Sequence, residues 1–80
     1  MRFDVVLSEL HLFKSRSQAR AAIEDGEALL NGVRVKPSHV VKAGDRVTLP
    51  STQGDREIEI LELPRGSVSK KAAKELIRET

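Results

Sequence analysis

The spacing of apolar residues changes once along this chain. The change divides the sequence into a part with helical spacing and a part with the spacing of strands. Residues 3–10 carry apolar side chains at helical spacing, and residues 16–25 place alanines and an isoleucine on a single helical face. Gly26 then supplies a typical helix end. Beyond it the apolar residues recur at the shorter spacing of strands. The pattern therefore predicts an α+β fold that begins with two helices.

The first strand pair is expected around Asn31 and Gly32. This dipeptide is the strongest short signal for a two-residue type I′ hairpin turn, because both of its residues readily adopt positive φ angles. Apolar residues flank it on both sides. Residues 28–30 and 33–35 are therefore predicted to pair as a hairpin.

Two further strands and a last helix complete the predicted elements. Residues 46–49 form one strand, and residues 56–63 form another in which acids alternate with isoleucines. That alternation predicts an acidic exposed face pointing away from any nucleic acid. Ser67 or Ser69 is expected to cap the last helix. The polar side of this helix carries basic residues, namely Lys70, Lys71, Lys74 and Arg78, and is interpreted as a solvated face or an extension of a basic surface.

Length and composition limit the classes of protein to which the chain can belong. Eighty residues lie near the small end of what folds on a hydrophobic core alone, so we expect one domain and no sizeable ligand cavity. The absence of cysteine excludes disulfides and thiolate metal sites. No apolar run approaches the roughly 20 residues that span a bilayer, and acids come too early for a signal peptide. We expect a soluble cytoplasmic protein with no membrane partner.

Residues 14–20 combine a helix start with three cations and no acid. Ser15 followed by Gln18 matches the capping box, in which each side chain satisfies the other residue's backbone amide. Arg16 and Arg20 would then share one helix face, and guanidinium groups form two-pronged hydrogen bonds to phosphate. Two interpretations stay open here, a site for a nucleic-acid backbone and a solvated, well-capped surface helix.

The charges along the chain are grouped by sign, although the net charge is only +2. Residues 11–23 and 33–46 are mainly basic, whereas acids gather in residues 24–27 and 55–62. Such grouping favours a polyanionic partner. The two aromatic residues are too few for stacking along a single strand. Binding should therefore use phosphates, 2′-hydroxyls and the shape of folded RNA.

Groups that would support catalysis do not converge in this sequence. His11 and His39 both fall in predicted connections, without the spacing of metal ligands. They are interpreted as loop residues or polar contacts to RNA. Glu57 and Glu59 share a strand face, which a solvated sheet surface explains better than a pair of catalytic acids. We expect no catalytic site, no metal site and no cofactor, and hence not an enzyme.

A set of positions agrees in residue type and spacing with a known family: Arg2, Phe3, Asp4, Leu7, Lys14, Ser15, Arg16, Ser17, Gln18, Ala19, Arg20, Ile23, Gly26, Asn31, Gly32, Lys36, Pro37, Ser38, Val41, Gly44 and Asp45. Residues 1–49 thereby resemble the S-four RNA-binding domain, named after protein four of the small ribosomal subunit. The resemblance implies two N-terminal helices packed on a small, mostly antiparallel sheet. With the strand and C-terminal helix of residues 56–79, residues 1–80 are expected to form a single RNA-binding domain.

The remainder of the chain is similar to the fifteen-kilodalton heat-shock protein subfamily of small bacterial proteins. That resemblance implies binding of rRNA or tRNA on a large ribosomal subunit that holds a stalled peptidyl-tRNA, in recycling or quality control. We expect the chain to act as a monomer. The alternative is a protein-interaction or accessory module that assists an RNA-modifying enzyme in trans.

The resemblance implies RNA contacts at the positions that match those of the family. They are Arg2, Lys14, Ser15, Arg16, Ser17, Gln18, Arg20, Asn31, Gly32, Arg34, Lys36 and, less directly, Lys42. For Arg2 an ion pair with Asp4 or a C-terminal acid stays open, and for Asn31 and Gly32 a role in forming the turn alone. The cations of the second helix and the hairpin are expected to converge on one surface.

Overall fold

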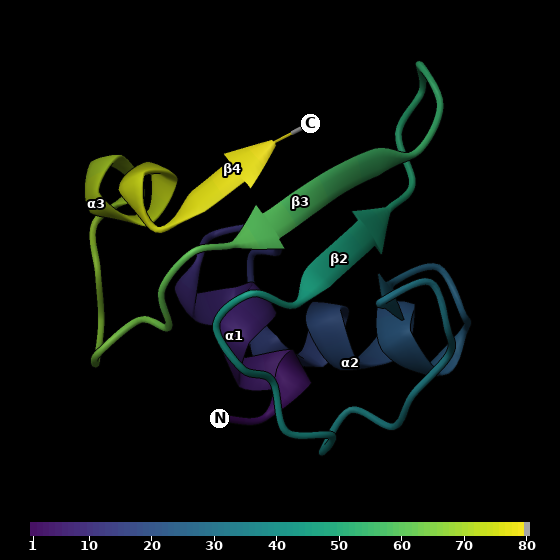
Figure 1. The fold of residues 1–80 in the computed structure, drawn as a ribbon. Helices are drawn as coiled ribbons and strands as arrows, with labels where there is room; N and C mark the ends of the chain where they lie inside the picture. Colours follow the sequence, from purple (N-terminus) through teal and green to yellow (C-terminus); the bar gives the residue numbers. More distant parts are fainter. Residues whose placement is uncertain (80) are drawn as a thin grey trace.

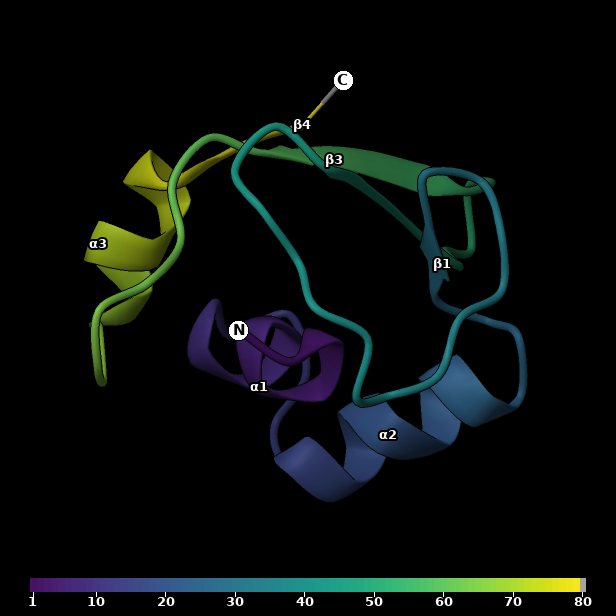
Figure 2. The ribbon, with the colours of Figure 1, turned by 60° about the horizontal axis from the view of Figure 1, so that its bottom comes forward.

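A computed structural model describes residues 1–79, and its helices and strands run in the order α1 (Phe3–Glu9), α2 (Arg16–Glu24), β1 (Leu29–Leu30), β2 (Arg46–Leu49), β3 (Arg56–Ile60), α3 (Lys70–Glu75) and β4 (Ile77–Glu79). The strands form one antiparallel sheet in the order β1-β2-β3-β4 (Figure 1). Helices α1 and α2 lie against one face of this sheet (Figure 2). This arrangement confirms the predicted α+β fold with two N-terminal helices on an antiparallel sheet.

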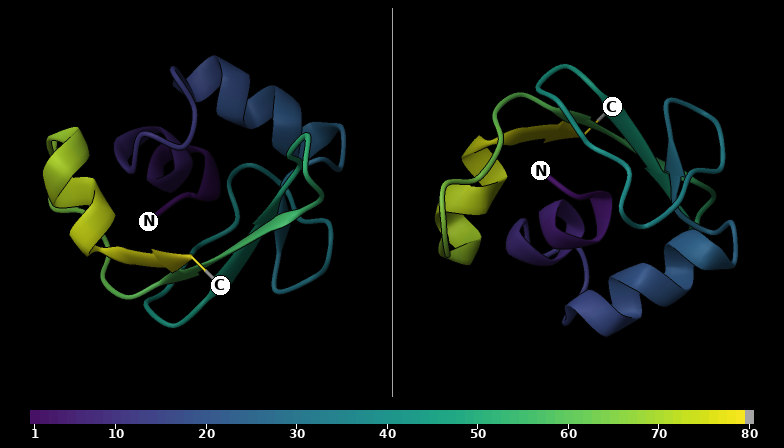
Figure 3. Two further views of the ribbon diagram at one scale, coloured as in Figure 1. Left: turned by 90° about the horizontal axis from the view of Figure 1, so that it is seen from above. Right: turned by 90° about the horizontal axis from the view of Figure 1, so that it is seen from below.

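The core lies between the first two helices and the sheet. The face of α2 that the sequence predicts to be buried is buried, and it consists of Ala19, Ala22 and Ile23. Small alanine side chains allow close approach between helices, and here α2 packs against α1. On the sheet, Ile58 and Ile60 of β3 are fully buried while the glutamates between and before them are not. Views along the vertical axis show α1 between α2 and α3 (Figure 3).

The start of α1 is held by the long connection between β1 and β2. Helix α1 has no side-chain cap, so its first amides need other acceptors. The Phe3 amide donates to the His39 carbonyl at 2.9 Å, and the Asp4 amide donates to the Pro37 carbonyl at 3.1 Å. These two hydrogen bonds fix residues 37–39 against the N-terminus of α1.

The predicted hairpin of residues 28–35 is correct at its turn and wrong beyond it. Asn31 and Gly32 have φ angles of 52° and 81°, as a type I′ turn requires. Leu30 and Val33 exchange both backbone hydrogen bonds, at 3.0 and 3.1 Å. After Val33 the chain leaves the sheet, and β1 pairs with β2 instead.

Contacts outside the sheet explain why this hairpin stops after one residue pair. The half-buried Val35 side chain packs against the hydrophobic core. The Arg34 guanidinium donates to the Glu24 carbonyl at the end of α2, at 2.7 Å. Both contacts draw residues 34–35 toward α2, and Pro37 has no amide with which to continue a strand ladder.

The structure of the C-terminal segment differs from the prediction, which placed Arg78 on the last helix beside the lysines. Ser69 caps α3, since its hydroxyl oxygen accepts from the Ala72 amide at 3.1 Å. The helix ends at Glu75, and Ile77–Glu79 form a strand, β4, paired with β3. Likewise β3 ends at Ile60 and not at residue 63.

Ion pairs between strands join β4 to β3 and neutralise the acids of β3. Arg78 donates to Glu59 at 2.7 Å, and Arg56 donates to Glu79 at 2.6 and 3.2 Å. Glu57 pairs with Arg46 at 3.2 Å. The exposed face of β3, predicted to be acidic, is therefore covered with alternating charges. The hydrogen bond from Arg78 lowers the pKa of the Glu59 carboxyl, and that from Arg56 lowers the pKa of the Glu79 carboxyl.

These lowered pKa values predict that acid weakens the attachment of β4. A carboxyl whose pKa is lowered by folding stabilises the fold above its ordinary pKa of 4.5, and that contribution is lost as the pH falls through the lowered value. As the pH falls below about 4.5, we expect the melting temperature of the wild type to fall more steeply than that of a Glu59→Gln/Glu79→Gln variant. Circular dichroism melts at a series of pH values measure this difference. Identical pH profiles for the two proteins would contradict the assignment.

Candidate nucleic-acid interface

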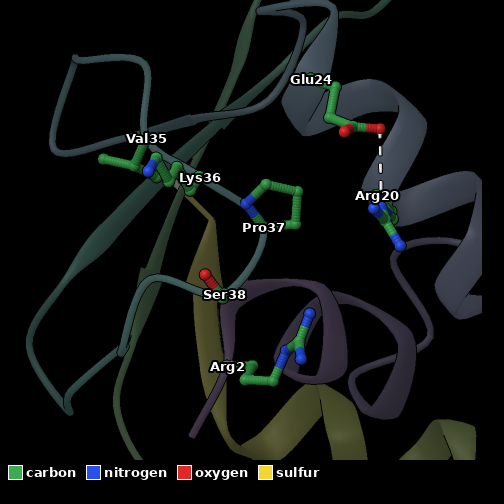
Figure 4. A pocket seen from close by; sticks show the side chains of 7 residues that line it. All are labelled: Arg2, Arg20, Glu24, Val35, Lys36, Pro37 and Ser38. Atoms are coloured by element: carbon green, nitrogen blue, oxygen red, sulfur yellow. Dashed lines mark ion pairs between the residues drawn. The ribbon is translucent and has the colours of Figure 1, made fainter.

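Three cations from separate segments line one open hollow beside α2, called here the Arg20 hollow. Arg2 precedes α1, Arg20 lies on α2, and Lys36 lies on the connection between β1 and β2 (Figure 4). The hollow has a volume of about 550 Å³. The remaining lining residues are Glu24, Val35, Pro37 and Ser38. The carbonyls of Pro37 and His39 bind the first amides of α1, which places Arg2 next to this connection.

Arg2 makes the ion pair with Asp4 that the sequence left open. Its guanidinium donates to both carboxylate oxygens of Asp4, at 3.1 and 3.0 Å. Within the described residues Asp4 is the one charged side chain in the core, 3% exposed. A buried carboxylate without its partner is costly, so Arg2 has a structural function. Its side chain is 48% exposed, which leaves part of the guanidinium facing the Arg20 hollow.

Arg20 is held much more weakly. Its guanidinium lies 3.6 Å from the Glu24 carboxylate, one turn further along α2, and both side chains are more than half exposed. Exposed pairs of this kind contribute about 0.2–1 kcal/mol. A phosphate could therefore displace Glu24 from Arg20 at little cost.

Arg34 does not line the Arg20 hollow. Its side chain lies over Gly26 and donates to the Glu24 backbone carbonyl. A cation at this end of a helix is favoured by the helix dipole. The RNA contact that the resemblance implies for Arg34 stays a prediction, and in the structure its guanidinium binds the C-terminal end of α2.

The start of α2 presents a second group of predicted residues. The Ser15 hydroxyl oxygen accepts from the Gln18 amide at 3.2 Å, as expected. The Gln18 side chain accepts from the Lys14 amide at 3.3 Å, one residue before the amide that a capping box predicts. Arg16 and Ser17 are exposed. Lys14 lies just before α2, Arg16 and Arg20 follow on the helix, and Arg20 lines the Arg20 hollow.

The remaining predicted residues lie outside the Arg20 hollow. The Asn31 side chain accepts from the Arg46 amide at 3.0 Å and donates to Asp45 at 3.2 Å, so it fastens the turn to β2. Asn31 and Gly32 border a separate hollow over β2 and β3. Lys42 is exposed in the turn before β2, where its amide donates to Asp45 at 2.9 Å.

Pro37 and Ser38 belong to the Arg20 hollow, although sequence reasoning gave them no role in the site. They were part of the matching pattern, and their position after Lys36 was the signal available. Among residues 1–79, no cluster of His, Cys, Asp or Glu has the size needed to hold a metal ion. No helix in the same range is long and apolar enough to cross a membrane.

The contact of Arg34 with α2 predicts an unequal cost for two glycine substitutions. Gly26 and Gly66 have φ angles of 76° and 74°, and a Cβ on Gly26 would lie 2.9 Å from the Arg34 Nε, whereas a Cβ on Gly66 would meet nothing within 4 Å. Gly66→Ala should cost about 1–2 kcal/mol of unfolding free energy from backbone strain. Gly26→Ala should cost more, because Arg34 must also move.

Urea unfolding measures both costs, and the Arg34→Ala background supplies the control. In that background the two substitutions should cost the same. An excess cost at Gly26 that persists without Arg34 would show that another contact is responsible.

Comparison with known proteins places these features in a family. The family model of the S4 domain, which is the S-four domain named above, matches residues 1–47 of this chain. The heat shock protein 15 homolog of Aeromonas salmonicida is 35% identical over 80 residues, which cover all of this chain and 61% of that protein. The RQC P-site tRNA stabilizing factor of Helicobacter pylori (strain J99) is 39% identical over 64 residues, covering 80% of this chain and 76% of that protein.

A solved structure is similar along the whole chain. Heat shock protein 15 of Vibrio cholerae, described as trimeric, has a TM-score of 0.92 and 34% identity, covering all of this chain and 81% of that one. The monomer expected for the present chain stays a prediction. The chain spans about three-fifths of the length of the Aeromonas relative. The S4 family model matches more than half of the residues of the present chain. This chain therefore belongs to the S4 domain family.

Proposed function

We propose that this protein binds structured RNA on the large ribosomal subunit, where it stabilises complexes that hold a stalled peptidyl-tRNA. One relative is named an RQC P-site tRNA stabilizing factor, and two others are named heat shock protein 15. The observation that carries the proposal is the group of cations from three segments at the Arg20 hollow. Action at the ribosome would place the protein in the cytoplasm.

The α2 face is the proposed primary contact with the RNA backbone. Arg16 is exposed and makes no ion pair within residues 1–79, and Arg20 has only its weak pair with Glu24. The two arginines are four residues apart, which separates them by about 6 Å along the helix axis. Both can therefore bind phosphates of one strand. The Ser15, Ser17 and Gln18 side chains would set the register beside them.

The connection between β1 and β2 would close the site from the other side. Lys36 lines the Arg20 hollow together with Arg2. The hydrogen bond from Arg34 to the end of α2 holds the residues just before Lys36 in place. Asn31, Gly32 and Lys42 would contact a more distant part of the same RNA.

Recognition is proposed to depend on RNA shape and phosphates. Phe3 is completely buried and Phe13 is partly buried against the core. Phe13 borders the hollow lined by Lys14 and Lys70, and one partly buried ring cannot form the row of stacking platforms that single-strand binding requires.

Removing the α2 arginines should weaken binding without changing its sequence preference. Arg16→Ala and Arg20→Ala should each lower the affinity for rRNA about tenfold and reduce the slope of log K against log salt by about 1. Fluorescence anisotropy with labelled rRNA fragments, at several salt concentrations, measures both quantities.

Arg65→Ala is the matched control, since Arg65 is exposed and forms no ion pair within the described residues but borders a different hollow. Its affinity should equal that of the wild type. Equal losses of affinity in all three variants would show a general effect of charge and would contradict the proposed site on α2.

Sucrose-gradient sedimentation tests the proposed ribosomal target. The tagged protein should sediment with large subunits that carry peptidyl-tRNA more than with free large subunits or intact ribosomes, and Arg16→Ala should reduce this association. Association with an RNA-modifying enzyme that persists after nuclease treatment, without sedimentation on subunits, would favour the accessory-module alternative.

A further inference from the structure

Helix α3 places two lysines beside the turn that joins α1 to α2. Lys70 and Lys74 line one hollow together with Leu10, His11 and Leu12, called here the Lys70 hollow. A neighbouring hollow, which shares His11, Leu12 and Lys70 with it, is also lined by Lys14. The lysines of α3 and Lys14, just before α2, therefore border two adjoining hollows.

The position of α3 is fixed by contacts with this turn and with the core. The His11 ring Nε2 lies 2.6 Å from the Val68 carbonyl oxygen, just before α3. Ser69 caps the helix, and Ala73 is buried on its inner side. Lys70 and Lys74 are one helical turn apart, so they share one side of a firmly attached helix.

The Lys70 hollow and the neighbouring hollow that Lys14 lines are positively charged. Within the residues that the structure describes, Lys14, Lys70 and Lys74 have no carboxylate at ion-pairing distance. Glu79 is the carboxylate that lines the Lys70 hollow, and Arg56 binds it at 2.6 Å. The lysine charges are therefore not compensated by their surroundings.

The Arg20 hollow and the Lys70 hollow lie at opposite ends of α1. Arg2 directly precedes α1 and lines the first, whereas Leu10 and His11 directly follow α1 and line the second. Lys14, just before α2, and Arg16 and Arg20 on this helix connect the two in sequence. One polyanion lying along α2 can therefore reach both hollows.

We propose that Lys70 and Lys74, together with Lys14, form a second phosphate-binding surface that extends the RNA site from α2 to α3. This inference rests on the proposed RNA binding and adds residues beyond the segment 1–47 that matches the S4 domain. Ammonium groups bind phosphate as point charges. The surface therefore contributes affinity and salt dependence, and it does not read base sequence.

Neutralising the two lysines tests this surface directly. Lys70→Gln/Lys74→Gln should lower the affinity for a labelled RNA hairpin, with a stem of about 16 base pairs, about tenfold at low salt and reduce the salt slope by about 1–2. Lys71→Gln is the matched control, because Lys71 lies on the same helix but lines neither hollow. Its affinity should stay within about twofold of the wild type. Glutamine retains helix propensity, and circular dichroism melts verify folding.

Lysine acetylation of the wild-type protein provides a second readout that needs no substitution. RNA should protect Lys14, Lys70 and Lys74 from acetylation in mass spectrometry and leave Lys71 reactive. If the wild type binds RNA and Arg16→Ala weakens it, but the α3 lysines are neither protected nor needed, the inference is overturned and the proposed function stands. Those lysines would then serve an acidic protein or solubility. If the wild type does not bind RNA at all, both proposals fail.

Discussion

Two backbone hydrogen bonds at the start of α1 determine where the candidate RNA-binding surface lies. The first amides of this helix lack a side-chain cap, and the carbonyls of Pro37 and His39 accept from them. A helix start in an 80-residue protein can hardly be left without acceptors. The long connection between β1 and β2 is thereby held across the N-terminus of α1. Arg2, Lys36 and α2 border one hollow because of this arrangement.

Arg2, Arg20 and Arg34 differ in how firmly their partners hold them. Arg34 binds a backbone carbonyl, and Arg2 neutralises a buried carboxylate with two hydrogen bonds. Releasing either would leave buried or helix-end groups without partners. Arg20 faces an exposed carboxylate at 3.6 Å, a contact that an anion can replace. The cost of freeing a side chain therefore ranks candidate RNA contacts that residue type alone does not distinguish.

The sequence predicted those features that depend on neighbouring residues. The Ser15 cap, the buried face of α2 and the Asn31–Gly32 turn follow from spacing within a few positions, and all are present. The end of the hairpin and the strand β4 were predicted incorrectly, since they depend on partners far along the chain. Arg34 bonds to a residue ten positions earlier, and Arg78 to one nineteen positions earlier. Neither contact leaves a local pattern that could be recognised in advance.

Cations of α2 and of the connection after β1 share the Arg20 hollow, as expected from their grouping in sequence, and the α3 lysines add a second cationic hollow. Helix α1 is seven residues long, about 10 Å, and a cationic hollow lies at each of its ends. Helix α1 separates the two hollows. It also holds the segments that border both of them, because its residues Phe3 and Leu7 are fully buried under α2 and the sheet. Packing of α1 therefore sets the spacing between the positive surfaces. A long, shaped polyanion such as folded RNA fits this spacing better than a small anion, which would occupy one hollow alone.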